Sequence, residues 1–284
     1  CHFPSRFYPS IFAFIDCYIS LYKVLYNDMV IKFKNLISIF FITLLLNGVS
    51  AFGAAATIAV ASNFAEVAKR LASDFESNSE HRLAIVTGAS GRFYAQILNG
   101  APFDVFLSAD SEKPLQLISS GHALPDSAFT YATGRLVLWS RDEALIKDGA
   151  SALSSNGFYR VAYANPRLAP YGKAALEVME ALSLFGFLER NLVQGENISQ
   201  AYQFVFTGNA DLGFVAQSQI LHNGELGIGS AWIIPSDLHS PINQDVVLLN
   251  RAKDNVAARE FMSFLRLPRT QAIIQSYGYE SEVP

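Results

Sequence analysis

The sequence predicts an α/β protein with mainly parallel sheets. Short apolar runs of strand character alternate with stretches in which apolar residues recur at helical spacing. Glycine and proline mark the ends of these stretches, as in LNGAP at 98–102 and SSGHALP at 119–125. A chain of 284 residues with 51% hydrophobic and 16% charged residues can form two ordinary domains.

The first 56 residues have the pattern of an export leader. From Met29, two lysines precede an apolar run from Leu36 to Leu46, and small residues follow. This order is typical of a secretory signal peptide, and the run is well short of the ~20 residues that span a bilayer. We expect 29–56 to be a signal peptide, cleaved near residues 51–56, and 1–28 to be a spurious or upstream extension. Because no cysteine follows the apolar run, we expect a free periplasmic protein rather than a lipoprotein.

The charge of the remaining chain argues against nucleic-acid binding. Of 21 basic and 25 acidic residues, four basic and two acidic residues precede position 57, so 17 basic and 23 acidic residues follow. A mildly acidic protein does not attract nucleic acid by its overall field. Both cysteines, Cys1 and Cys17, also precede position 57. We therefore expect no disulfide in the exported protein.

The strands can be placed one by one along the chain. We expect them near 57–61, 83–87, 104–108, 134–139, 160–164, 211–215, 230–234 and 244–249. A turn at Thr133-Gly134 precedes RLVLWS, and the chain leaves a loop at Pro241 for DVVLLN. If the segment between these points forms its own sheet, lobe 1 comprises 57–133 and 242–284, and lobe 2 comprises 134–241. Two helical stretches separated by Pro268 end the chain.

Four strand-to-helix junctions resemble one another. They lie in TIAVASNF, IVTGASGR, NPRLAPYG and GENISQ, and their helices begin at Ser62-Asn63, Ser90, Pro170-Tyr171 and Asn197-Ile198. A helix start leaves backbone N–H groups unpaired and carries partial positive charge, so an anion can bind there. In open α/β sheets these junctions lie at the carboxyl ends of the strands, where ligands usually bind. Each junction alone is also explained by ordinary helix capping.

Several segments together resemble the periplasmic molybdate-binding proteins, the solute receptors of molybdate ABC transporters. The matching text is AVASNF, GASGRFYAQILNGAPFDVFLSAD, FTYATGRLVLWS, NPRLAPYGKAAL and GNADLGFVAQSQI. The resemblance covers 57–284 and implies a two-lobed periplasmic binding protein of type II, with hinge strands and a tetrahedral oxyanion between the lobes. The ligand residues that it implies are Ser62, Asn63, Ser90, Tyr171 and Ile198, the last two through backbone N–H groups.

The resemblance also implies what accompanies the site. The ligand is molybdate or tungstate bound as an oxyanion, with no cofactor and no bare metal ion, and the partner is a membrane permease. We expect a monomer. Some members of the family present a tyrosine hydroxyl just after the LG-V strand, where this chain has Ala216. We expect Asn63 to replace that donor.

Other functions remain open at the level of sequence. A receptor for another tetrahedral oxyanion, such as sulfate, fits the same junctions. An exported hydrolase would use Ser62 or Ser90, but neither lies in a G-x-S-x-G elbow. The carboxylates of Asp104 and Asp110 lie too far apart along a strand to work as a pair. The four histidines after position 57 lack the spacing of metal ligands, and they are His81, His122, His222 and His239. A purely structural periplasmic protein is the third alternative. We expect no catalytic residue.

Overall fold

The computed structural model describes residues 17–23, 25–34, 36, 53–155, 157–222 and 224–281. The chain divides into two compact units, Cys1–Phe52 and Gly53–Pro284. In the first unit, 17–23 and 25–34 are helical. Within the described ranges, no helix combines the length and the apolar character needed to cross a membrane. Most of the predicted signal peptide, including the run 37–46, lies outside the described residues.

The second unit contains two five-stranded sheets, and we call each sheet with its helices a lobe. The sheet of lobe 1 has the order β2-β1-β3-β12-β4. Its strands are β1 (Ala55–Ala61), β2 (Arg82–Gly88), β3 (Val105–Leu107), β4 (Phe129–Gly134) and β12 (Ile242–Leu248). Its helices are α2 (Ala65–Ser77), α3 (Ser90–Leu98), α4 (Glu112–Ser119), α9 (Val256–Leu265) and α10 (Pro268–Ser276), and the 3₁₀ turn η1 (Ser62–Phe64) precedes α2.

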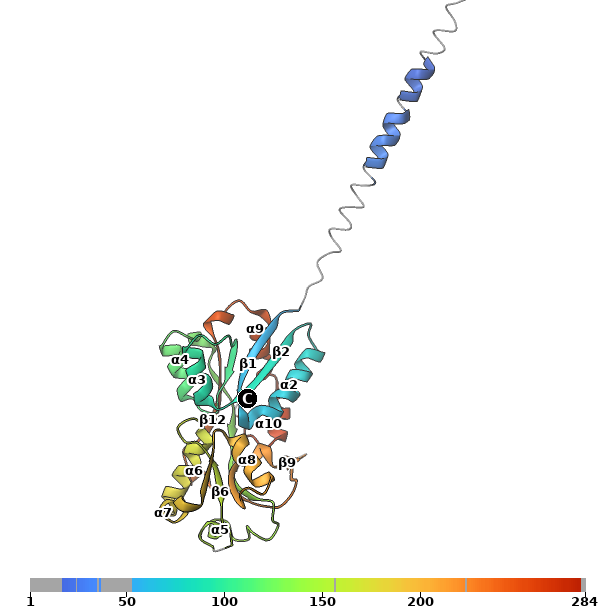
Figure 1. Ribbon diagram of the computed structural model, residues 1–284. Helices are drawn as coiled ribbons and strands as arrows, with labels where there is room; N and C mark the ends of the chain where they lie inside the picture. The colour runs from blue at the N-terminus through green and yellow to red at the C-terminus, as the bar shows by residue number, and fades with distance from the viewer. Residues whose placement is uncertain are drawn as a thin grey trace, which may run out of the picture. The chain divides into compact units, whose positions relative to one another are not determined.

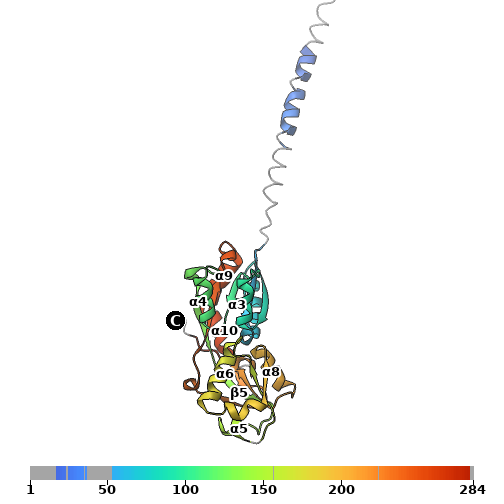
Figure 2. The same cartoon turned by 60° about the vertical axis from the view of Figure 1, so that its left-hand side comes forward.

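Lobe 2 has the same plan. Its sheet has the order β11-β5-β8-β6-β7. The strands are β5 (Leu136–Ser140), β6 (Val161–Ala164), β7 (Leu192–Gly195), β8 (Leu212–Ala216) and β11 (Ser230–Ile233). The helices are α5 (Ser151–Ser154), α6 (Pro170–Ala181), α7 (Phe185–Leu188) and α8 (Ile198–Phe206). A 3₁₀ turn, η4 (Gln217–Gln219), follows β8, and a short hairpin of β9 (Leu221–His222) and β10 (Glu225–Leu226) comes next. Figures 1 and 2 both show α3 and α4 in one lobe and α6 and α8 in the other.

The predicted α/β class is confirmed, but the sheets are mixed rather than mainly parallel. In lobe 1, β1 runs parallel to β2 and β3, while β12 runs antiparallel to β3 and β4. In lobe 2, β6 runs parallel to β7 and β8, while β5 runs antiparallel to β8 and β11. Each antiparallel pairing includes a strand next to a crossing between the lobes. These strands enter or leave their sheet without a crossover helix.

The turn expected at Thr133-Gly134 is wrong. Both residues belong to β4, and only Arg135 separates β4 from β5 in the other sheet. The chain therefore passes between lobes through nearly continuous extended backbone. The return crossing lies between β11 and β12, and Ile242 at the start of β12 pairs with Gly134. Strand β7 was not predicted, because the segment 192–195 has only two apolar residues before Gln194 and Gly195.

Alternation along β1 fixes where the helices pack. Ile58 and Val60 belong to a core cluster with Phe64 and Leu71, whereas Ala59 belongs to a cluster with Phe93. Successive side chains of a strand point to opposite faces of its sheet. Helices α2 and α3 therefore cover opposite faces of lobe 1, and both begin at the same edge of the sheet.

Candidate functional site

The four predicted junctions all lie at carboxyl ends of parallel strands. Strand β1 leads into η1, β2 into α3, β6 into α6 and β7 into α8. The carboxyl ends of parallel strands lie along one edge of a sheet, so each lobe presents two helix starts together. The backbone N–H groups at these helix starts point away from the strands that precede them.

In lobe 1, the predicted residues are buried polar groups. Ser62, Asn63 and Ser90 are 7%, 4% and 1% exposed. The Ser90 hydroxyl oxygen accepts a hydrogen bond of 3.0 Å from the Ala109 backbone N–H. Its own hydrogen is therefore still available to donate. No hydrogen bond joins the Ser62 hydroxyl to another residue in the described ranges.

In lobe 2, the predicted residues offer backbone groups. Tyr171 follows Pro170, which begins α6 without an N–H of its own. Ile198 begins α8, and the side chain of the N-cap residue Asn197 accepts from the Gln200 N–H at 3.1 Å. Tyr171 and Ile198 are both buried. A side-chain cap therefore fixes the start of α8, whereas α6 begins with Pro170 and has no side-chain cap.

Capping leaves some N–H groups without a protein acceptor. The backbone N–H groups of all five predicted residues donate to no other group in the described part of the chain. Buried N–H groups without an acceptor are rare in proteins because each one costs free energy. An oxyanion between the lobes would satisfy them.

Contacts across the lobes bring the helix starts together. The Ser199 hydroxyl at the start of α8 donates to the Ser62 carbonyl at 3.1 Å. The Gly91 N–H in α3 donates to the carbonyl of Leu168, in the loop before α6, at 2.8 Å. Tyr171 and Ile198 also share one buried cluster with three alanines from the junctions. Ala61 precedes Ser62, Ala169 precedes Pro170, and Ala109 is hydrogen-bonded to Ser90. Junctions from both lobes therefore meet at one place.

A cleft of about 380 Å³ lies beside this meeting point. Gly91 and Ala109 of lobe 1 and Ala169 and Pro170 of lobe 2 are among its lining residues. None of the five predicted residues lines it. The cleft therefore marks the edge of the interlobe contact rather than the predicted site itself.

The side chain of Asn63 does not have the role expected from the sequence. Its amide nitrogen donates to the Gln244 side chain at 2.8 Å and to the Tyr279 hydroxyl at 2.9 Å, so both amide hydrogens are used. The side chain then offers a ligand only a carbonyl oxygen, which an oxyanion repels. In this conformation Asn63 is left with its backbone N–H as a donor.

Sequence reasoning missed three residues that surround Asn63. They are Ser218, Gln244 and Tyr279, each buried. Gln244 carried little signal, because its neighbours Asn243 and Asp245 are also polar. Ser218 and Tyr279 carried none, since they come from a turn and from the C-terminal segment.

The Tyr171 hydroxyl has no hydrogen-bond partner among the described residues. Burial raises the pKa of this hydroxyl well above its ordinary value, and the nearby Tyr279 and Tyr131 raise it further. The side chain lies close to Tyr279 and Asn63, but without hydrogen-bond geometry. The hydroxyl remains protonated at neutral pH.

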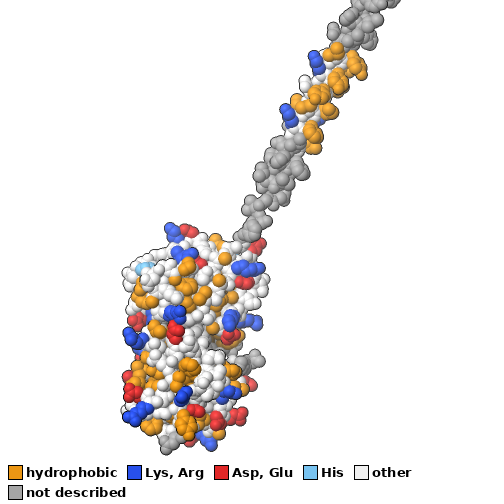
Figure 3. Space-filling view, viewed as in Figure 1, with side chains coloured by type: hydrophobic (Ala, Val, Ile, Leu, Met, Phe, Trp, Pro, Cys, Tyr) orange, Lys and Arg blue, Asp and Glu red, His pale blue; other side chains and the backbone are white. Residues whose placement is uncertain are grey.

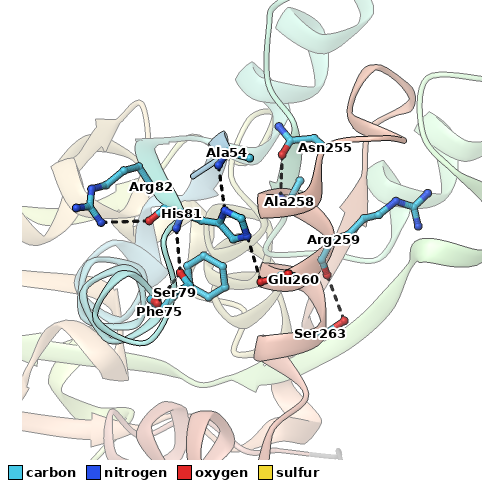
Figure 4. Close-up of polar contacts among 10 residues, drawn as sticks. All are labelled: Ala54, Phe75, Ser79, His81, Arg82, Asn255, Ala258, Arg259, Glu260 and Ser263. Carbon is cyan, nitrogen blue, oxygen red and sulfur yellow. Dashed lines mark hydrogen bonds and ion pairs between the residues drawn. The ribbon is translucent and has the colours of Figure 1, made fainter. Parts of the chain in front are cut away.

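The two serines considered as nucleophiles, Ser62 and Ser90, are not paired with a histidine in the described part of the chain. The hydrogen bonds recorded for Ser90 and Ser62 include no histidine. His81 lies between the Ala54 N–H, at 3.0 Å, and the Glu260 carboxylate, at 3.2 Å, as Figure 4 shows. It lies in the loop between α2 and β2, is 15% exposed and stacks on Phe75, so it has a structural role.

Charged groups are nearly absent from the interior. Asp104 and Asp245 are the charged residues among those buried, and the buried set within the described ranges contains no lysine, arginine or histidine. Asp104 accepts from the Thr57 N–H, and Asp110 binds Lys113, so these two carboxylates act separately. On the face seen in Figure 3, basic and acidic side chains are interspersed. The hydrogen-bond donors among the buried side chains of the described residues are therefore neutral.

Comparison with known proteins identifies the family. The model of the bacterial extracellular solute-binding proteins matches residues 56–280. This chain belongs to that family. Among solute-binding proteins, the molybdate-binding protein ModA of Rhodobacter capsulatus is 48% identical over 224 residues, which are 79% of this chain and 87% of that protein. ModA of Azotobacter vinelandii is 46% identical over 222 residues, 78% of this chain and 88% of that protein.

A solved structure of a solute-binding protein has the same architecture. The periplasmic molybdate-binding protein of Azotobacter vinelandii aligns with a TM-score of 0.77 and 39% identity, covering 79% of this chain and 98% of that one. The two-lobed fold implied by the sequence is confirmed.

An exposed ion pair between α3 and the segment before α8 connects the two lobes of this solute-binding protein. The Arg92 guanidinium of α3 lies 2.8 Å from the Glu196 carboxylate before α8, and the two side chains are 57% and 38% exposed. Exposed pairs contribute ~0–1 kcal/mol. We expect Glu196→Gln to weaken solute binding by about fivefold at most, and high salt should remove the difference.

Titration calorimetry at low and high salt tests this expectation. Glu66→Gln is the matched control, since it breaks an exposed pair with Lys69 inside lobe 1. A loss of more than about thirtyfold in Glu196→Gln alone would show that the ion pair contributes far more than exposure allows.

Proposed function

We propose that this chain is an extracytoplasmic receptor that binds molybdate between its two lobes and delivers it to an ABC transporter. The relatives that are 48% and 46% identical are molybdate-binding proteins. The observation that carries the proposal is the set of backbone N–H groups without a protein acceptor, on buried residues at helix starts from both lobes. We propose Ser62, Asn63, Ser90, Tyr171 and Ile198 as the ligand residues.

Neutral donors suit a buried dianion. Taking the anion out of water is prohibitive unless its oxygens receive hydrogen bonds. Each hydrogen bond to a charged group contributes roughly 1.5–3 kcal/mol, so five backbone N–H groups and two serine hydroxyls can support micromolar or tighter binding after ordering costs. A buried lysine or arginine would be left as an unpaired charge in the free receptor.

The same donors define what the site accepts. Tungstate has the same charge and nearly the same size as molybdate, so we propose that it binds too. Protonated phosphate needs an acceptor for its hydrogen, and no carboxylate belongs to the five residues. Ala216 closes β8 as a buried residue and supplies no hydroxyl. Sulfate, another fully ionised tetrahedral anion, is the second candidate ligand.

Contacts at the start of β1 bear on leader removal. The Ala54 N–H binds His81, the Ala54 carbonyl accepts from the Arg82 N–H at 3.0 Å, and Asn255 donates to the Ala55 carbonyl at 2.8 Å. Figure 4 shows Ala54 bonded to His81, with Asn255 nearby. We place the cut before Ala54, because cleavage further along would remove residues that the fold holds. The released receptor would act in the periplasm as a monomer.

A melting experiment with residues 53–284 tests the function. We expect molybdate and tungstate to raise the melting temperature strongly, because a ligand at one hundred times its dissociation constant adds about 2.7 kcal/mol of stability. Sulfate and phosphate serve as matched oxyanions. A shift with sulfate alone would assign the receptor to sulfate. No shift with any of the four would contradict the oxyanion receptor.

A further inference from the structure

Asn63 lies at the centre of a buried hydrogen-bond network. Its amide nitrogen donates to Gln244 of β12 and to the Tyr279 hydroxyl. Its backbone carbonyl accepts from the Tyr279 hydroxyl at 2.9 Å and from the Ser218 hydroxyl at 3.0 Å. Asn63 is thus held through both its side chain and its backbone.

The orientation of the two amides is fixed by the network itself. The Gln244 amide nitrogen donates to the Ile242 carbonyl at 3.0 Å, so the Gln244 oxygen faces Asn63. Asn63 must then present its nitrogen to Gln244, and the same nitrogen reaches Tyr279. The opposite orientation would place two acceptors or two donors together.

Tyr279 reaches this position because the chain turns sharply after α10. Gly278 has a φ of +84°, which glycine adopts readily. The ring of Tyr279 packs edge-on against Phe64, with 5.3 Å between centroids. Glu280 then pairs with Thr133 of β4 through backbone hydrogen bonds of 2.7 and 2.9 Å. The C-terminal segment is therefore fixed where the lobes join.

The network also links the lobes. Ser218 belongs to η4 of lobe 2, and its hydroxyl lies 3.1 Å from the Tyr279 hydroxyl. Both hydroxyl hydrogens can go to the Asn63 carbonyl, so Ser218 and Tyr279 hold that carbonyl together. Removing the Tyr279 hydroxyl also leaves one hydrogen of the buried Asn63 amide without its acceptor. The η1 turn, whose N–H groups face the proposed oxyanion, is thereby attached to both lobes.

We propose that Tyr279 is a positioning residue for the oxyanion site, fixing the η1 turn through Asn63 so that its N–H groups meet the ligand. This inference rests on the proposed function. Tyr279 lies 216 positions from Asn63 in the sequence, and it would affect the affinity without contacting the ligand.

Tyr279→Phe tests the proposal, since it keeps the ring against Phe64 and removes only the hydroxyl. Tyr131→Phe is the matched control, because Tyr131 is also buried and packs edge-on on Phe64 but its hydroxyl has no partner among the described residues. We expect molybdate to bind about tenfold more weakly to Tyr279→Phe and unchanged to Tyr131→Phe. Calorimetry well below the melting temperature measures the affinity of the folded protein. If Tyr279 had only a structural role, the substitution would lower the melting temperature and leave the affinity unchanged.

Ser218→Ala gives an independent test if Tyr279→Phe folds poorly. It removes the other hydroxyl bound to the Asn63 carbonyl, and we expect a loss of affinity of several-fold. In a double-mutant cycle the losses should not add, because both hydroxyls serve one carbonyl. Affinity equal to wild type in either folded variant would overturn the positioning role. Failure of the wild-type protein to bind molybdate would instead overturn the proposed function, and the comparison would then use the oxyanion that does bind.

Discussion

Ser90→Asp is expected to abolish molybdate binding while the protein stays folded. The carboxylate would lie at the start of α3, where negative charge is favourable next to the helix N–H groups. It would occupy the donors that the oxyanion needs and repel the dianion. A dianion bound there would be a buried charge that has lost its partners, which costs ~3–5 kcal/mol. The affinity for molybdate should therefore fall by about 10²- to 10³-fold or more.

Calorimetry measures the loss of binding in Ser90→Asp, and a melting curve without ligand shows whether the variant is still folded. Ser90→Ala is the graded control, because it removes one donor and adds no charge, and its loss should be about tenfold. Equal affinity of Ser90→Asp and wild type would remove Ser90 from the site. An unfolded Ser90→Asp would show that the buried hydroxyl supports the fold as well, and Ser90→Ala would then decide its role in binding.

Gly91→Val is expected to prevent the lobes from meeting. A Cβ at Gly91 would lie 3.0 Å from the carbonyl oxygen and 3.1 Å from the Cα of Leu168 in the other lobe, and valine adds two methyl groups. These neighbours are backbone atoms, which cannot rotate away. If the donors of one lobe are kept from the ligand, at least two charged hydrogen bonds are lost, which corresponds to about a hundredfold loss of affinity or more.

Gly186→Val is the control for the glycine substitution. Gly186 lies in helix α7, and a Cβ there meets no atom within 4 Å. Small-angle scattering should show Gly91→Val more extended than wild type in saturating molybdate, whereas Gly186→Val should be indistinguishable from wild type. Full affinity in Gly91→Val would mean that the contact with Leu168 is not part of the bound state.

The junctions were predictable from sequence because their signals are local. Strand alternation followed by helical spacing gave β1 and α3 within two residues, and Pro170 and Asn197 marked the starts of α6 and α8. The partners of Asn63 were not predictable, because Gln244 and Tyr279 are 181 and 216 residues away in the sequence. The crossing strand β4 was missed because glycine at 134 favours a turn in sequence, whereas here it admits the Tyr171 ring, whose hydroxyl lies 2.0 Å from where a Cβ would be.

The paired crossings determine how the receptor can move. Gly134 and Ile242 lie opposite each other in adjacent strands, and Glu280 adds a third strand-like segment beside Thr133. Such a ribbon bends across its flat face but resists sliding and twisting of one strand past another. The lobes should therefore rotate about a single hinge axis. Each closure would then bring the donors of the two lobes to the same relative positions around the ligand.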